Sequence, residues 1–109
     1  LCFQISTNET TFIKSAMNKI FEKDFDMFNL NAGCPAKKNV QSGCGAALMA
    51  DIPKLKEIIK TIKENLPAHI PFTVKMRAGF KEKNALDVAK TCQVLPDDLR
   101  IRTQCFCKC

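Results

Sequence analysis

The segment Phe72-Thr-Val-Lys-Met-Arg77 decides which fold this sequence favours. Its residues predict a short β-strand over 72–76, and side chains alternate between the two faces of a strand. Thr73, Lys75 and Arg77 then share one face, and apolar side chains occupy the other. A doubly wound sheet covers both faces with apolar helices, whereas a barrel can hold cationic side chains inside, near its mouth. The segment therefore favours a barrel.

Predicted strands and helices alternate on both sides of this segment. Short apolar runs predict further strands over residues 1–5 and 25–30, and apolar residues at helical spacing predict a helix after each strand. These helices are expected from the capping residues 6–8 to residue 21, from the cap Asp51 to residue 66, and over residues 84–94. Such alternation indicates an α/β fold with a parallel sheet and a functional site at the carboxyl ends of its strands.

Polar side chains are expected to converge on that edge of the sheet. Gln4 lies near the end of the first strand, Asn31 follows the second, and Lys75 and Arg77 belong to the third. We place Gln4 and Asn31 at the level of Lys75, so that three successive strands each supply a polar group to one rim. This convergence predicts a ligand site.

Charge and cysteine content narrow the class of protein. The formal charge of +6, from 17 Lys and Arg against 11 Asp and Glu, favours a polyanionic partner, although a solvated lysine-rich surface explains it equally well. The 7 cysteines are odd in number and irregularly spaced, and no export signal is visible, so we expect reduced thiols in a cytoplasmic protein. No apolar run approaches the roughly 18 residues of a membrane span. Because a strand begins at residue 1 without an initiator Met, we interpret the chain as a fragment.

Four motifs occur together along the chain. They are Phe3-Gln4-Ile5, Asn31-Ala-Gly-Cys-Pro35, a basic and glycine-rich loop (Lys37-Lys38 with Gly43-Cys-Gly45-Ala-Ala-Leu48), and Val74-Lys75-Met-Arg77-Ala-Gly79. In this order and spacing they resemble the tRNA-dihydrouridine synthases. The resemblance implies a TIM (β/α)8 barrel, here a partial one with about three βα units, that holds FMN over its strand ends. It also implies reduction of the flavin by NADPH, a helical tRNA-binding domain further along, and tRNA, not DNA or a membrane, as the partner.

The resemblance assigns the catalytic role to Cys34. Reduction of uridine to 5,6-dihydrouridine needs a hydride at C6 and a proton at C5 of the base, and the family takes the hydride from reduced FMN and the proton from this cysteine. A thiol with a pKa of about 8.5 stays mostly protonated at neutral pH, yet it releases its proton more readily than a hydroxyl. Without the surrounding motif, an ordinary buried turn cysteine would be the simpler interpretation.

Cofactor and substrate contacts follow from the same resemblance. Gln4 and Lys75 are expected to bind the flavin, with Lys75 beside the N1–C2 carbonyl edge, where negative charge accumulates on reduction. Asn31 is expected to face the flavin and the target uracil, although Gln4 and Asn31 could each cap a strand end instead.

Basic residues are expected to hold the substrate. Arg77, Lys37 and Lys38 are assigned to the phosphates of the tRNA, because the target base must leave its stack to reach FMN and needs such anchoring. We predict no metal site, since Cys105, Cys107 and Cys109 lack the usual spacing of zinc ligands, and we expect a structural role for His69.

The sequence also departs from the family pattern. Asn29 stands where the family usually has an acidic residue, which alters hydrogen bonds around the site without removing it. Residues 1–94 are assigned to the central part of an FMN-binding barrel domain, and residues 95–109 to a divergent Cys-rich tail of unknown role that lacks the expected next strand and FMN phosphate site. Since a complete barrel takes roughly 250 residues, we expect this piece to bind FMN poorly and to be inactive alone.

Three alternatives remain open at this point. A non-catalytic RNA-binding remnant would keep the basic loop without turnover, and a flavin barrel acting on free pyrimidines would not use tRNA. A metal or redox module built on the cysteine-rich tail would respond to zinc or thiol titration.

Overall fold

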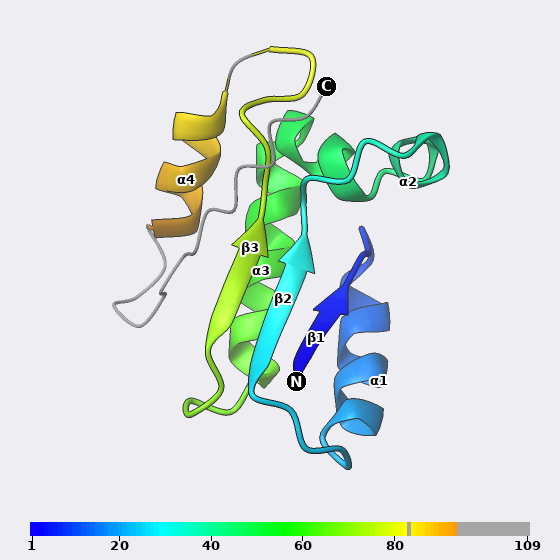
Figure 1. The fold of residues 1–109 in the computed structure, drawn as a ribbon, viewed down its shortest axis with the longest axis vertical. Coiled ribbons are helices and arrows are strands. Elements are labelled where there is room, and N and C mark those ends of the chain that lie inside the picture. Colours follow the sequence, from blue (N-terminus) through cyan, green and yellow to red (C-terminus); the bar gives the residue numbers. More distant parts are fainter. Residues whose placement is uncertain (83, 94–109) are drawn as a thin grey trace.

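A parallel sheet of three strands organises the molecule. The computed structural model describes residues 1–82 and 84–93. The strands β1 (Cys2–Ile5), β2 (Met27–Asn31) and β3 (Phe72–Lys75) lie side by side in the order β1-β2-β3, and both neighbouring pairs are parallel (Figure 1). The predicted α/β class and parallel sheet are therefore confirmed.

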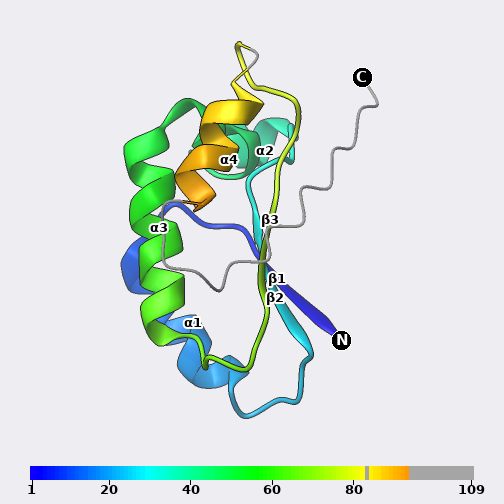
Figure 2. The same ribbon diagram turned by 90° about the vertical axis from the view of Figure 1, so that its left-hand side faces the viewer.

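Three helices cover one face of this sheet. The helix α1 (Thr10–Ile20) connects β1 to β2, α3 (Ile52–Asn65) precedes β3, and α4 (Ala85–Gln93) follows it. Figure 2 shows all three on the same side of the strands. Sheet order follows chain order, and parallel crossovers share one hand, so successive helices return over the same face. In a doubly wound sheet the strand order reverses and sends helices to both faces.

The hydrophobic core lies between the sheet and these helices. Phe28, Leu30 and Val74 point from the strands toward the helices and are fully buried. Phe3, Phe28 and Phe72 are register partners, and their rings form a row with centroid separations of 5.9 and 6.2 Å. The largest fully buried helix side chains opposite them are Ile13, Met17, Leu55, Ile58, Ile59, Ile62 and Val88. The core therefore uses only one strand face and leaves the polar face to the site.

The helix α3 begins as the sequence predicts. The Asp51 side chain accepts a hydrogen bond of 3.1 Å from the backbone N–H of Lys54, and Pro53 stands in the first turn. Its buried side chains Leu55, Ile58, Ile59 and Ile62 are those of the predicted stripe.

The predicted start of α1 was wrong. The helix begins at Thr10 without a side-chain cap, because the proposed capping residues bind elsewhere. The Thr7 hydroxyl accepts from the Glu9 backbone N–H at 3.1 Å, and the Asn8 amide donates to the Ser42 carbonyl at 2.8 Å. Asn8 thereby ties the start of α1 to the loop that follows β2.

That loop contains two short helices that the sequence did not predict. They are α2 (Lys37–Gln41) and the 3-10 helix η1 (Gly45–Ala50). Both lie beyond the carboxyl ends of the strands, at the end to which the arrows point in Figure 1. Their position makes them part of the candidate site.

Some predictions fall at or beyond the limits of the described chain. No helix in the described ranges is both long and apolar enough to cross a membrane. The predicted last helix is confirmed as α4, but its expected final residue, Val94, lies outside the described residues, as do residues 95–109 with Cys105, Cys107 and Cys109.

Candidate active site

The strand face that the helices leave uncovered carries two rows of polar residues. Gln4, Asn29 and Thr73 are aligned across the three strands, and Asn31 is aligned with Lys75 one level closer to the strand ends. The predicted level of Gln4 was therefore wrong, because Gln4 lies opposite Asn29 and not opposite Asn31. Parallel register is set by packing of the helices that connect the strands, and the sequence pattern alone does not specify it.

Asn31 shapes the turn that carries the candidate catalytic cysteine. It is the last residue of β2, and its side chain is 7% exposed. Its Oδ1 accepts hydrogen bonds from the backbone N–H groups of Gly33 at 3.1 Å and Cys34 at 3.0 Å. Of the two roles left open by the sequence, capping of the strand end is the one that the contacts show.

The turn packs closely against the end of β3. The Ala32 N–H donates to the Lys75 carbonyl at 2.7 Å. A Cβ atom on Gly33 would lie 3.1 Å from the Met76 carbonyl carbon, so a larger residue would push the turn away from β3. This approach brings the Cys34 turn next to Lys75 and Arg77.

A second contact holds Cys34 from the other side. The Cys34 carbonyl accepts from the Ala46 N–H at 2.9 Å, which joins the turn to η1. Gly45 has a φ of +60°, and a Cβ atom there would lie 2.6 Å from the Cys34 carbonyl oxygen. The start of η1, at Gly45 and Ala46, therefore packs against the backbone of Cys34.

The surroundings of Cys34 favour its thiolate. The backbone N–H of Ala36, followed by the Asn39 side chain, hydrogen-bonds the sulfur and lowers the pKa of the Cys34 thiol. Partial burial opposes this shift, and the positive charge of Lys75 adds to it. The sequence identified Cys34 and Lys75 but not Asn39, because nothing local marks a loop asparagine as facing a thiol.

We expect the thiol of Cys34 to ionise at lower pH than an ordinary cysteine. Because its pKa is lowered, the rate of alkylation by iodoacetamide should rise at a lower pH than for a cysteine in an unstructured peptide. Replacement Asn39→Ala removes one stabilising hydrogen bond and should move the midpoint to higher pH. Mass spectrometry of the Cys34 peptide across a pH series measures the rate. An identical midpoint in Asn39→Ala would show that this side chain does not act on the sulfur.

The predicted flavin-binding residues lie on the same face of the sheet. Gln4 is exposed, and its Nε2 donates a hydrogen bond of 2.6 Å to Asn29 Oδ1. Lys75 is half-buried and is the last residue of β3, so it stands at the carboxyl end of that strand. Both positions are compatible with a ligand lying across the strand ends.

The predicted phosphate-binding residues occupy two places near this edge. Arg77 is half-buried two residues beyond β3, next to the Gly33 turn. Lys37 and Lys38 are exposed and open α2. The structure thus brings Arg77 close to the Cys34 turn, and it puts the two lysines on a separate short helix at the same end of the sheet.

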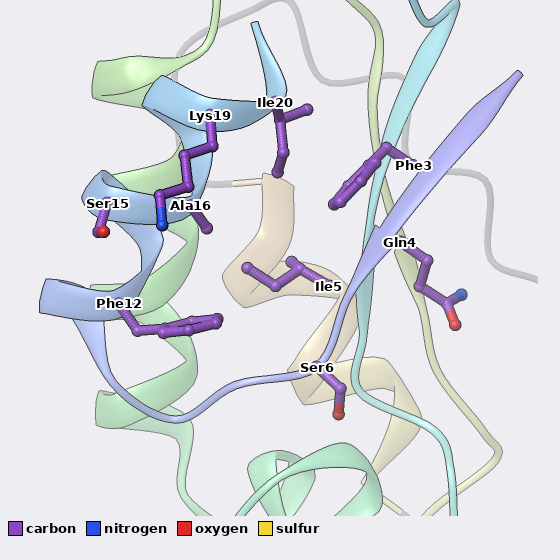
Figure 3. Close-up of a pocket in the computed structure, with 9 residues that line it drawn as sticks. All are labelled: Phe3, Gln4, Ile5, Ser6, Phe12, Ser15, Ala16, Lys19 and Ile20. Atoms are coloured by element: carbon purple, nitrogen blue, oxygen red, sulfur yellow. The ribbon is translucent and has the colours of Figure 1, made fainter. Parts of the chain in front are cut away.

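Neither the buried thiols nor a hollow beside β1 belongs to the group of residues around Cys34. Cys44 and Cys92 are buried, and burial raises the pKa of Cys92 to about 11. A hollow of about 480 Å³ opens between β1 and α1, where Phe3 and Phe12 line it (Figure 3). Gln4 is among the residues that line the hollow, although its side chain points to the opposite side of β1 from Phe12 in this view, and none of Cys34, Asn31 or Lys75 lines it. The strand ends therefore remain the candidate site.

The chain is similar in sequence to known proteins over most of its length. The family model described as "Dihydrouridine synthase (Dus)" matches residues 1–95, which include β1, the Cys34 turn and β3. The chain belongs to the dihydrouridine synthase family. It is 45% identical over 65 residues to the tRNA-dihydrouridine(16) synthase of Neisseria meningitidis serogroup A, covering 59% of this chain and 20% of that protein. It is 36% identical over 96 residues to a probable tRNA-dihydrouridine synthase of Helicobacter pylori strain J99, covering 87% of this chain and 29% of that protein.

The dihydrouridine synthase segment described here is short relative to those proteins. The matched part spans between 20% and 29% of the length of these two relatives. Residues 1–95, which the family model matches, include all seven residues predicted for the site: Gln4, Asn31, Cys34, Lys37, Lys38, Lys75 and Arg77.

Proposed function

We propose that this chain is part of an enzyme that reduces uridine to 5,6-dihydrouridine in tRNA, with Cys34 as the proton donor. The observation that carries the proposal is the position of Cys34, held by Asn31 and η1 beside Lys75 at the carboxyl end of a parallel sheet. A site at this edge is typical of barrels, and we interpret the three strands as a segment of a TIM barrel in a cytoplasmic protein.

Cys34 is suited to donate a proton to C5 of the base. Addition of a hydride to C6 would leave negative charge on the pyrimidine, and a general acid within reach would neutralise it by protonating C5. The lowered pKa eases release of the proton, and the protonated form that must act is lost as pH rises through that pKa. The rate of a reaction that depends on this proton should therefore decline at a lower pH than it would with an unperturbed thiol.

The residues at the strand ends fit the edge of a flavin ring. FMN, once reduced by NADPH, would supply the hydride that goes to C6. The ring edge presents carbonyl oxygens and an N–H group, which match the ammonium of Lys75 and the amide of Gln4. Lys75 would also stabilise negative charge on the reduced ring.

Arg77, Lys37 and Lys38 would hold the RNA. Their charges lie at the same end of the sheet as Cys34, and phosphate contacts position a nucleic acid without reading its sequence. Arg77, whose backbone lies next to Gly33 of the cysteine turn, would anchor the nucleotide next to the flipped base.

FMN binding is the first test of this proposal. Because the chain holds only part of a barrel, we expect it to bind FMN weakly, with quenching of flavin fluorescence at about tens of micromolar, and Lys75→Ala to weaken binding by about tenfold, because a charge-assisted contact is lost. Lys60→Ala is the matched control, since it removes an exposed lysine from the outer side of α3. No quenching by the unmodified chain at tens of micromolar, or equal losses in both variants, would contradict a flavin site at Lys75.

A further inference from the structure

A chain of hydrogen bonds crosses the polar face of the sheet one level below the strand ends. Gln4 Nε2 donates to Asn29 Oδ1 at 2.6 Å, and Asn29 Nδ2 donates to Thr73 Oγ1 at 2.7 Å. The Thr73 hydroxyl in turn donates to the Phe28 carbonyl, at the longer distance of 3.4 Å. The three side chains are register partners, so one residue from each strand takes part.

The last acceptor determines which group donates and which accepts in each of these hydrogen bonds. A backbone carbonyl can only accept, so a Thr73 hydroxyl that donates to it presents its lone pairs to Asn29. Asn29 then turns its NH2 group to Thr73 and its oxygen to Gln4. Gln4 must therefore donate its own NH2 group to this oxygen. The Gln4 oxygen is then the end of the amide that can face a ligand.

Burial of Asn29 and Thr73 makes it costly to exchange the donors and acceptors in this row. Asn29 is 9% exposed and Thr73 is 4% exposed, whereas Gln4 is exposed. A buried amide that loses its partner is penalised more than an exposed one, so the two buried residues constrain the exposed one. Gln4 is the only member of the row that a ligand can reach directly.

We propose that Asn29 and Thr73 are positioning residues that orient the Gln4 amide with its oxygen toward the ligand. The site would then select a planar ligand that presents an N–H donor at this point. The ligand part of this inference rests on the proposed flavin site, whereas the orientation of the amide does not.

The proposal also explains why an asparagine can stand at this position. An acidic side chain at residue 29 would only accept, and it would therefore receive the Gln4 NH2 group just as Asn29 does. The Thr73 hydroxyl would reverse and donate to the carboxylate. Either residue type orients Gln4 in the same way, but an apolar residue cannot.

Nuclear magnetic resonance of the 109-residue chain without ligand tests the orientation directly. In Asn29→Leu and Thr73→Val, solvent exchange of the Gln4 side-chain amide protons should accelerate about threefold or more, because their hydrogen bond is lost or loosened. Asn29→Asp and Thr73→Ser keep the acceptor and the hydroxyl, and both should retain the exchange rate of the unmodified chain. The backbone amide spectrum shows in each variant whether the fold is intact.

FMN titration of the same variants tests the ligand part. Asn29→Leu should weaken FMN binding by about threefold to tenfold, and Asn29→Asp should restore it. Unchanged Gln4 exchange in folded Asn29→Leu and Thr73→Val would overturn the proposal. If exchange changes as expected but the unmodified chain does not bind FMN, the orientation is supported and the proposed function fails instead.

Discussion

Cys34→Ala is expected to lower the rate of uridine reduction in tRNA by at least about 100-fold, the usual size of a general-acid contribution. The alanine has no proton to donate to C5, and no other described thiol can replace it. Cys44 and Cys92 are buried, and Cys2 lies at the opposite end of β1 from the Cys34 turn. The measurement is dihydrouridine formed per tRNA with NADPH and FMN, made on the longest form of the protein that turns over.

Two controls separate loss of the proton donor from loss of the site. Cys2→Ala removes an exposed thiol outside the site and should leave the rate within about twofold, since exposed substitutions away from a site have small effects. FMN affinity should be equal in Cys34→Ala and the unmodified protein. A Cys34→Ala protein that reduces tRNA at the unmodified rate would remove Cys34 from the mechanism, whatever its effect on stability.

Gly45→Ala is expected to lower the free energy of unfolding by about 2 kcal/mol or more. The added Cβ atom would meet the Cys34 carbonyl oxygen at 2.6 Å in a backbone with φ of +60°, and this oxygen belongs to main chain that cannot rotate away. Relief requires the Cys34 turn to move, so the pH dependence of Cys34 alkylation should change as well. Urea unfolding followed by circular dichroism gives the free energy.

Gly43→Ala is the matched control for this change. Gly43 also has a positive φ, of +76°, but a Cβ atom there would meet the Asn8 side chain at 2.8 Å, and that side chain can rotate. Gly43→Ala should therefore cost less than Gly45→Ala and leave Cys34 alkylation unaltered. Equal costs would mean that backbone strain alone matters and that η1 does not hold the cysteine turn.

The helices were predictable where their determinants are local. Asp51, Pro53 and the apolar stripe of α3 lie within one stretch of chain, and the helix begins and packs as they indicate. The start of α1 was not predictable, because Asn8 binds a carbonyl 34 residues away. The short helix η1 was missed for a similar reason, since Gly45 and Ala46 are placed by contacts with Cys34.

The polar row of Gln4, Asn29 and Thr73 is partly predictable from the sequence. β2 alternates Phe28 and Leu30 with Asn29 and Asn31, just as β3 alternates apolar side chains with Thr73 and Lys75. This pattern could have marked Asn29 as a residue of the polar face, as it did Thr73. It could not have shown that they bind each other, because that depends on which residues lie opposite across the sheet.

By itself the sequence determined the family, the order of strands and helices, and which side chains share a strand face. These follow from motifs and periodicities that lie within short stretches of the chain. Only the tertiary structure decided that Gln4 pairs with Asn29, that Asn31 caps the Cys34 turn, and that Asn39 and η1 support the thiol. The physical reason is that parallel strands are joined through helices, so their register and the contacts of their loops are set by packing between distant residues.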